Sequence, residues 1–368
     1  MSSTGDPSSP SPRVYLLTMV IVIAVILAGV GVANRALNPL VYDPSSLRSV
    51  AQDMAAGRNY ANYDPNINWR QLRKEQISLM TSTPDVIVFG GSRWQEAHAA
   101  LMPGSTMFDA WVSNDTAEDA MAIVYLLDKA HRLPKPLVLS LRYISFQPAG
   151  QRDTPEWQEW APEYRAMAAQ LGIAADPYLQ TLPTRRWEGL FNSPSLFTRT
   201  QEMAAVPDSP HATTDTQTPG LDILSADGSL LWSGKSQAKF TKAYTDKDVR
   251  TQLAAQAGTA PAIDPKLVDA MGTTIGFLRS KGVHVVIAQT PYHPDFYAGI
   301  QGRPFAGTLV KIEQIAQGWR AQYGVDIVGG FDPARIGCSR AEYIDYIHSR
   351  ASCLAKVLRQ VADLPQGA

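Results

Sequence analysis

A serine behind a buried strand and a late aspartate–histidine pair are the residues of this sequence whose types and spacing could do chemistry together. Ser92 follows the apolar run 86–89 and two glycines, and Asp345 lies three positions before His348. A serine hydroxyl is a weak nucleophile that needs an adjacent base, and a carboxylate can orient that base. These residues predict acyl chemistry at Ser92, with His348 as general base and then acid and Asp345 as its orienter.

Each of these residues also has a purely structural interpretation. A serine after a strand is commonly the N-cap of the next helix, and Asp345 and His348 could be solvated residues of a surface loop. Position favours function, because both blocks follow predicted strands of an α/β core. In open α/β sheets, ligands bind outside the carboxyl ends of the strands. Gly90 and Gly91 also permit a tight turn before Ser92.

The candidates for stabilising an oxyanion or binding substrate are less complete. The backbone N–H of Ser92 is a natural first donor. Asn114 follows the second predicted strand and could donate its side-chain amide, although a helix N-cap explains it equally well. His293 follows another core strand and could line the site, but a structured loop between Pro291 and Pro294 explains it too. No grouping of His, Cys and carboxylates has metal-ligand spacing, so we predict neither metal nor cofactor.

The elements that must position these residues alternate between strand and helix. Short continuous apolar runs are typical of strands that are buried on both faces, and longer periodic segments are typical of helices. Asn114, Asp115 or Thr116 could cap the first helix of the core. Strands are predicted at 85–89, 106–108, 137–141, 283–288 and 325–328, and helices at 117–130, 265–281, 309–323 and 350–362. This order predicts a doubly wound parallel α/β sheet.

An irregular segment interrupts the alternation. Residues from about 143 to 262 are rich in Pro, Thr, Gln and Asp, and we interpret them as a partly helical insertion within a domain that spans 84–368. The tryptophans of this insertion could stack on sugar rings, although packing in the core is their commoner use. They are Trp157, Trp160, Trp187 and Trp232. Residues 34–83 are predicted to form a membrane-proximal stalk, with a helix at 69–80.

The N-terminal region predicts a membrane anchor. Residues 1–13 are rich in Ser and Pro and are expected to be a disordered cytoplasmic tail. Residues 14–33 then carry no charge, and about 20 apolar residues span a bilayer core. A cleavable signal is the alternative, because Gly31, Val32 and Ala33 are small enough for a cleavage site. Flanking charge does not fix the orientation.

Two cysteines bracket the aspartate–histidine pair. Cys338 and Cys353 are the only cysteines of the chain, and together with the apolar segment they predict a disulfide in an oxidising compartment. Two unrelated buried thiols are the alternative. A bridge would hold the loop that carries Asp345 and His348 and would place the domain outside the cytoplasmic membrane.

Length and charge bound the remaining possibilities. The 368 residues can bury a full core, and the net charge of −1, with 45% apolar and 18% charged residues, gives no electrostatic reason to expect nucleic acid. No basic cluster and no nucleic-acid motif is present. A nucleic-acid partner is therefore not predicted.

Together these blocks resemble the SGNH (GDSL-like) hydrolase superfamily. The nucleophile block is 88–93 and the Asp–His block is 345–348, with residues 288–294 and 330–332 fitting the later part of the pattern. The resemblance covers roughly 84–142 and 265–362. It is nearest to the membrane-anchored extracytoplasmic members that are associated with MBOAT acyltransferases, such as the alginate O-acetylation proteins and the D-alanyl transfer protein of teichoic acids.

The resemblance implies a flavodoxin-like SGNH fold, an acyl-serine intermediate on Ser92, a polysaccharide substrate and an MBOAT partner. It also adds Arg93 to Asn114 and His293 as residues for oxyanion or substrate binding. One departure is clear: the Gly-x-Asn-Asp block after the third strand is absent, and Arg142 stands there instead.

The leading hypothesis is a membrane-anchored, periplasm-facing acyltransferase or esterase that acts on a cell-surface or exported polysaccharide. The alternative is a non-catalytic polysaccharide-binding or assembly protein with the same fold, for which the missing block leaves room. A third reading is a simple esterase with a small soluble substrate. Labelling of Ser92 by a serine-reactive probe separates an enzyme from a binding protein.

Overall fold

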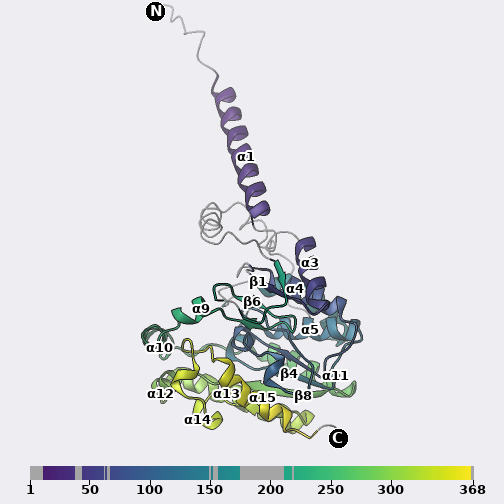
Figure 1. The fold of residues 1–368 in the computed structure, drawn as a ribbon, viewed down its shortest axis with the longest axis vertical. Helices are drawn as coiled ribbons and strands as arrows, with labels where there is room; N and C mark the ends of the chain where they lie inside the picture. The colour runs from purple at the N-terminus through teal and green to yellow at the C-terminus, as the bar shows by residue number, and fades with distance from the viewer. Residues whose placement is uncertain are drawn as a thin grey trace, which may run out of the picture.

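The body of the molecule is a mixed α/β structure (Figure 1). The computed structural model describes residues 11–37, 44–61, 63, 67–148, 151, 156–174, 211–217 and 219–365. Most of the predicted tail, residues 1–10, and a central part of the predicted insertion, residues 175–210 with Trp187, lie outside these ranges.

Five parallel strands form the main sheet, in the order β3-β2-β4-β8-β9. Numbered along the chain, these strands run second, first, third, fourth, fifth. Their bounds are β2 (Val86–Phe89), β3 (Met107–Asp109), β4 (Pro136–Ser140), β8 (His284–Gln289) and β9 (Asp326–Gly329). The predicted parallel α/β sheet is therefore confirmed, with each strand within a residue or two of its expected place.

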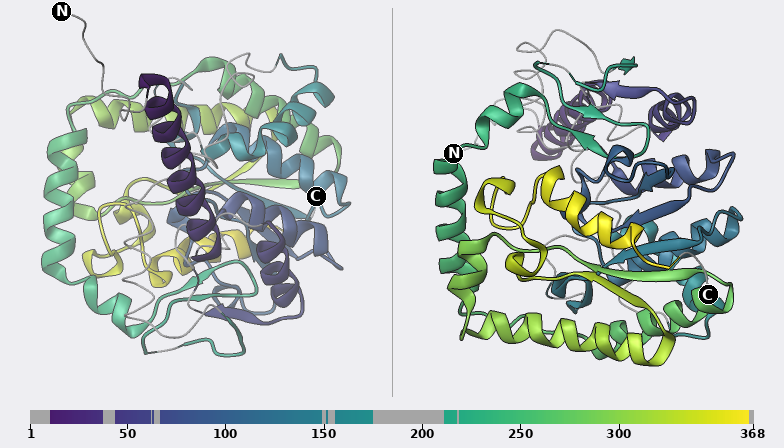
Figure 2. Two further views of the ribbon diagram at one scale, coloured as in Figure 1. Left: turned by 90° about the horizontal axis from the view of Figure 1, so that it is seen from above. Right: turned by 60° about the horizontal axis from the view of Figure 1, so that its bottom comes forward.

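The sheet is buried because helices cover both faces. Every residue of β2 and β4 is buried, as their continuous apolar runs predict. On one face α5 (Ala117–Lys129), α11 (Pro265–Ser280) and α13 (Pro304–Tyr323) pack in succession, and α15 (Ala351–Ala362) lies with the short turn η2 (Ala99–Leu101) on the other (Figure 2).

A second, smaller sheet joins regions that are far apart in the sequence. Its strand order is β5-β1-β6-β7, and all its pairs are antiparallel. The strands are β1 (Asn59–Ala61), β5 (His211–Thr213), β6 (Ile223–Leu224) and β7 (Leu230–Leu231). Segments of the predicted stalk and of the predicted insertion thus pair with each other.

The stalk and insertion also supply helices. From the stalk come α3 (Pro44–Ala55) and α4 (Trp69–Leu79), and from the insertion α6 (Ala161–Gln170), α9 (Gly234–Lys239) and α10 (Lys242–Gln256). Trp160, at the start of α6, is fully buried, and its indole N–H donates to the Arg70 carbonyl at 3.0 Å. This tryptophan packs within the body, whereas Trp232 is half-buried. The remaining short helices are α12 (Pro294–Ile300) and α14 (Pro333–Ile336).

The N-terminal helix α1 (Pro12–Leu37) extends outside the α/β body (Figure 1). Its segment Pro12–Ala33 has a mean hydropathy of 2.9 and is long and apolar enough to cross a membrane. Length and composition therefore agree with the predicted span, and the helix starts earlier and ends later than residues 14–33. A signal sequence near an N-terminus would meet the same two criteria.

The predicted disulfide is present. Cys338 and Cys353, 15 positions apart, are bonded to each other. The bond joins the end of α14 to the first turn of α15 and closes the loop that carries Asp345 and His348. A closed loop of about 15 residues restrains the unfolded chain by roughly 3 kcal/mol in the entropic account.

Candidate active site

Ser92, His348 and Asp345 form a continuous line of polar contacts. Ser92 Oγ lies 2.8 Å from His348 Nε2, and His348 Nδ1 lies 2.6 Å from Asp345 Oδ2. With Nδ1–H donating to the carboxylate, Nε2 is the atom that accepts the serine proton. The histidine and aspartate side chains are 21% and 18% exposed, so the line is sheltered but open to solvent. Two segments separated by 256 positions meet here.

The Asp345 carboxylate is held in its ionised form. Its Oδ1 accepts the backbone N–H groups of Ile347 at 2.8 Å and of His348 at 2.7 Å, while Oδ2 faces the imidazole. Burial alone would raise the pKa of Asp345, but the adjacent His348 and these hydrogen bonds lower it below its ordinary value. A fixed anion of this kind can orient an imidazole and stabilise its protonated form.

The turn that presents Ser92, residues 90–94, depends on two glycines and is called the serine turn below. Gly90 and Gly91 follow β2, and the chain then enters a single 3₁₀ turn, η1 (Ser92–Trp94), rather than a longer helix. A Cβ at position 90 would lie 2.6 Å from the buried Trp94 ring and closer still to Ser140, so only glycine fits. The carbonyl of Gly90 accepts the N–H of Val112, which ties the turn to the segment after β3.

Position within the sheet explains why Ser92 lies at this edge. The connection that leaves β2 leads to β3 on one side, and the connection that leaves β3 returns to β4 on the other. The carboxyl ends of β2 and β4 therefore flank the point where the strand order reverses, which is where open α/β sheets bind ligands.

The loop that carries His348 is held by its own backbone. Tyr343 and Ser349 form an isolated antiparallel bridge, and the Ile344 N–H donates to the His348 carbonyl at 3.0 Å. The Cys338–Cys353 disulfide closes the same loop. The loop is therefore a small closed unit whose conformation sets the orientation of the His348 ring.

Helix α10, from the insertion, packs against the same loop. The Thr245 hydroxyl donates to the Ile344 carbonyl at 2.9 Å, and the Tyr346 N–H donates to Asp248 at 3.1 Å. Gln256 Nε2 also donates to the Tyr346 hydroxyl at 2.8 Å. The insertion therefore positions the base half of the site. The sequence did not indicate this role, because these residues carry no motif.

Glu96 links three parts of the site. One carboxylate oxygen accepts the Trp232 indole N–H at 2.8 Å, and the other accepts the N–H of Ala351, at the start of α15, at 3.1 Å. Burial raises the pKa of Glu96 above its ordinary value, although these hydrogen bonds and the nearby Arg350 and His348 oppose the rise. The residue joins the serine turn to the insertion and to the helix that follows His348.

The three residues predicted for oxyanion or substrate binding are Asn114, Arg93 and His293, and the structure describes all three. Asn114 is exposed and has a left-handed backbone (φ 49°), and Thr116 rather than Asn114 caps α5. Arg93 is buried and donates to the Thr290 carbonyl at 3.3 Å. His293 is buried and caps α12, where it accepts the N–H of Asp295. Burial also lowers the pKa of His293. These three roles stay predictions.

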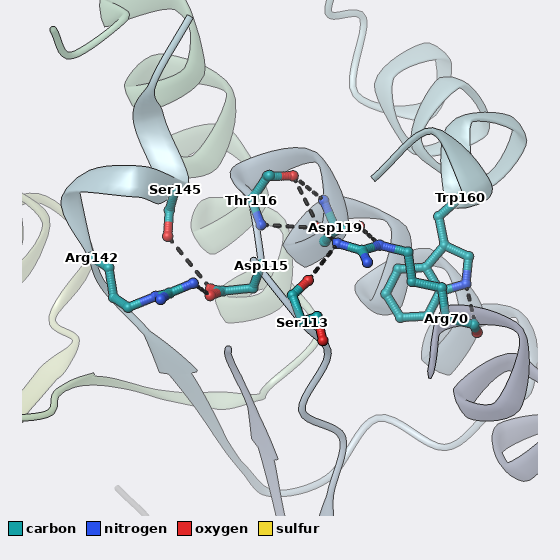
Figure 3. Close-up of polar contacts among 8 residues, drawn as sticks. All are labelled: Arg70, Ser113, Asp115, Thr116, Asp119, Arg142, Ser145 and Trp160. Carbon is teal, nitrogen blue, oxygen red and sulfur yellow. Dashed lines mark hydrogen bonds and ion pairs between the residues drawn. The ribbon is translucent and has the colours of Figure 1, made fainter. Parts of the chain in front are cut away.

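An ion pair that the sequence did not indicate lies against the serine turn. Arg142, just after β4, pairs with Asp115, and their side chains are 6% and 1% exposed (Figure 3). A Cβ at position 91 would lie 2.5 Å from Arg142 Nη2 and closer still to Asp115 Oδ1. The guanidinium therefore packs directly on the backbone that precedes Ser92. Only the folded sheet brings positions 115 and 142 together.

A second buried ion pair involves the same segment, residues 113–119, which carries both Asp115 and Asp119. Arg70 on α4 donates to both carboxylate oxygens of Asp119, at 2.8 and 2.6 Å, and to the Ser113 carbonyl at 3.0 Å. Figure 3 shows Arg70 and Arg142 on opposite sides of the segment that carries the two aspartates. Thr116 caps α5 between them and shares Asp119 through a capping box.

Within the part of the chain that the structure describes, no group of three His, Cys, Asp or Glu side chains is arranged to hold a metal ion. No protein-family model matches the sequence, and no curated protein matches it significantly.

Proposed function

We propose that this chain is a membrane-anchored, extracytoplasmic serine acyltransferase or esterase that acts on O-acyl groups of a cell-surface or exported polysaccharide. The observation that carries the proposal is the hydrogen-bonded line Ser92–His348–Asp345. Nucleophile, base and orienter at these distances are the parts that covalent acyl transfer requires.

The reaction runs in two halves. The Ser92 hydroxyl oxygen attacks the acyl carbonyl while its proton passes to His348 Nε2, and the carbonyl electron pair moves to oxygen. Collapse re-forms the carbonyl, breaks the ester C–O bond and returns the proton from His348 to the departing alcohol. The acyl-serine is then attacked by water in an esterase or by a sugar hydroxyl in a transferase, with His348 again taking the proton. Collapse of this second intermediate breaks the bond between Ser92 Oγ and the acyl carbon, and His348 returns the proton to Oγ, which frees the enzyme.

Three further observations support the finer parts of the proposal. The strand order, second-first-third-fourth-fifth, is the flavodoxin-like order, as expected of an SGNH-type fold. The apolar helix α1 supports a membrane anchor, and the Cys338–Cys353 disulfide supports an oxidising compartment. A polysaccharide substrate and an MBOAT partner rest on the sequence resemblance.

A fluorophosphonate probe tests the proposal on the full chain in detergent. We expect the wild-type protein to be labelled on Ser92, and Ser92→Ala and His348→Ala to lose labelling while their thermal unfolding stays close to wild type. A folded wild-type protein that resists the probe would contradict the enzyme and favour the non-catalytic binding protein.

A donor–acceptor assay then separates transfer from hydrolysis. The full chain is given a p-nitrophenyl acetate donor with and without an oligosaccharide acceptor. Acetylated oligosaccharide that depends on Ser92 indicates transfer, whereas free acetate at an unchanged rate indicates an esterase.

A further inference from the structure

Two buried guanidinium groups lie at the turn that contains Ser92, one within it and one packed on Gly91. Arg93 and Arg142 are 3% and 5% exposed. Asp115 pairs with Arg142, whereas Arg93 lies with its Cζ 4.2 Å from the centre of the Tyr292 ring and donates to the Thr290 carbonyl. Taken together, Arg93, Arg142 and Asp115 carry one net positive charge at the turn that contains Ser92.

The pairing of Arg142 is incomplete. Its Nη2 contacts Asp115, but among the residues that the structure describes its Nε has no hydrogen-bond partner, and the same holds for the Nε of Arg93. Burial, and then the neighbouring Arg93 cation, lower the pKa of Arg142 to about 9, so it stays protonated at neutral pH. A buried charge with an unmade hydrogen bond costs free energy of folding.

The Arg70–Asp119 pair shows that the same segment can form a complete pair. Arg70 is equally buried, but it donates through two nitrogens to both oxygens of its carboxylate. The incomplete pair is the one that packs on Gly91, next to Ser92. Excess positive charge is therefore concentrated where the proposed reaction places a negative oxygen.

We infer that Arg142, held by Asp115, is a positioning residue that stabilises the oxyanion formed when Ser92 is acylated. The inference rests on the proposed function. Arg142 acts through its electrostatic field at Gly91, the residue that it contacts directly before Ser92. As the carbonyl electron pair moves to oxygen, the nearby guanidinium offsets the new charge in a site of low dielectric.

The test measures the rate at which the full chain in detergent is labelled by a fluorophosphonate, over a range of probe concentrations. For Arg142→Met we expect a fall of roughly 10- to 100-fold in the maximal labelling rate, with the probe concentration at half-maximum unchanged. Arg142→Lys keeps the charge and should recover most of the rate. Arg70→Lys is the matched control, because it alters a pair of equal burial on the far side of the segment, and should label as wild type.

Asp115→Asn distinguishes an electrostatic role from a scaffold. Removing the carboxylate leaves more net positive charge, so labelling at least as fast as wild type supports the inference. If Asp115→Asn and Arg142→Lys both lose rate as Arg142→Met does, Arg142 is only a scaffold and the inference is overturned. This pair of variants decides the question even if Arg142→Met does not fold.

The same labelling experiment distinguishes failure of the proposed function from failure of the inference about Arg142. A wild-type protein without Ser92-dependent labelling overturns both proposals. Normal labelling of wild type and of a folded Arg142→Met overturns the inference alone.

Discussion

The pairs Arg70–Asp119 and Arg142–Asp115 share their chemistry and their burial, and they differ in completeness. The first joins α4 to α5 through two parallel hydrogen bonds and a third to a backbone carbonyl. The second lies at the carboxyl end of β4 with one guanidinium nitrogen unpartnered among the described residues and with the Arg93 cation nearby.

The difference separates two uses of a buried charge. A complete pair fixes the register between two elements, and its removal leaves an isolated charge in the core. An incomplete pair contributes less to stability but leaves a field that acts on its surroundings. Along residues 113–119 the complete pair lies on the side of helix α4, and the incomplete pair lies on the side of Arg142 (Figure 3).

The largest effect is expected from breaking the complete pair. Arg70→Met leaves the Asp119 carboxylate buried without its main partner, and we expect the free energy of unfolding to fall by about 3–5 kcal/mol. Urea denaturation of the full chain in detergent, followed by tryptophan fluorescence, measures the change. Arg142→Met should lose clearly less, because it also removes repulsion from Arg93. Equal losses in the two variants would remove the distinction between the pairs.

A smaller effect is expected from crowding the incomplete pair without changing its charge. Gly91→Ala places a methyl group against Arg142 and Asp115, and overpacking of this kind destabilises by about 1–3 kcal/mol. Labelling of Ser92 should also slow. Gly318→Ala in α13 is the control, because no atom lies within 4 Å of its new Cβ, and helix propensity predicts a gain of about 0.5–1 kcal/mol. A Gly91→Ala variant with wild-type stability and labelling rate would mean that the Arg142–Asp115 pair does not pack tightly against the serine turn.

The smallest effect concerns the residue between the two aspartates. The Thr116 hydroxyl accepts the N–H of Asp119 at 3.2 Å and caps α5, so Thr116→Ala should lower the free energy of unfolding by about 1 kcal/mol. Thr116→Ser keeps the hydroxyl and should restore most of it. Since neither guanidinium is touched, the labelling rate of the folded protein should stay at the wild-type value. A slower rate would mean that the cap also positions Asp115.

The strands of the main sheet could be predicted because continuous apolar runs, as in residues 86–89, indicate strands that are buried on both faces. The cap of α5 could be narrowed only to three neighbours. Asn114 takes the left-handed conformation and Asp115 turns to Arg142, which leaves Thr116 as the cap. Choices of this kind depend on partners that are distant in sequence.

The same reason limits prediction of the site. Ser92, Asp345 and His348 are found from residue type and place in the chain, but Arg142 reads in sequence only as a departure from a family pattern. Its partner Asp115 and its contact with Gly91 exist only once β2 and β4 are neighbours. The strands of the small sheet escape prediction because segments of two or three residues carry no period.

The hydrogen bond between Ser92 and His348 spans 256 positions, which has a consequence for synthesis. A nascent chain that ends after β4 contains Ser92 but neither His348 nor Asp345. His348 follows α10, β8 and β9 in the sequence, so it is synthesised after all three elements. Contacts between distant segments form late in folding. In the proposed mechanism, the growing polypeptide therefore has no acyl-transfer activity until nearly all of the α/β body has been synthesised.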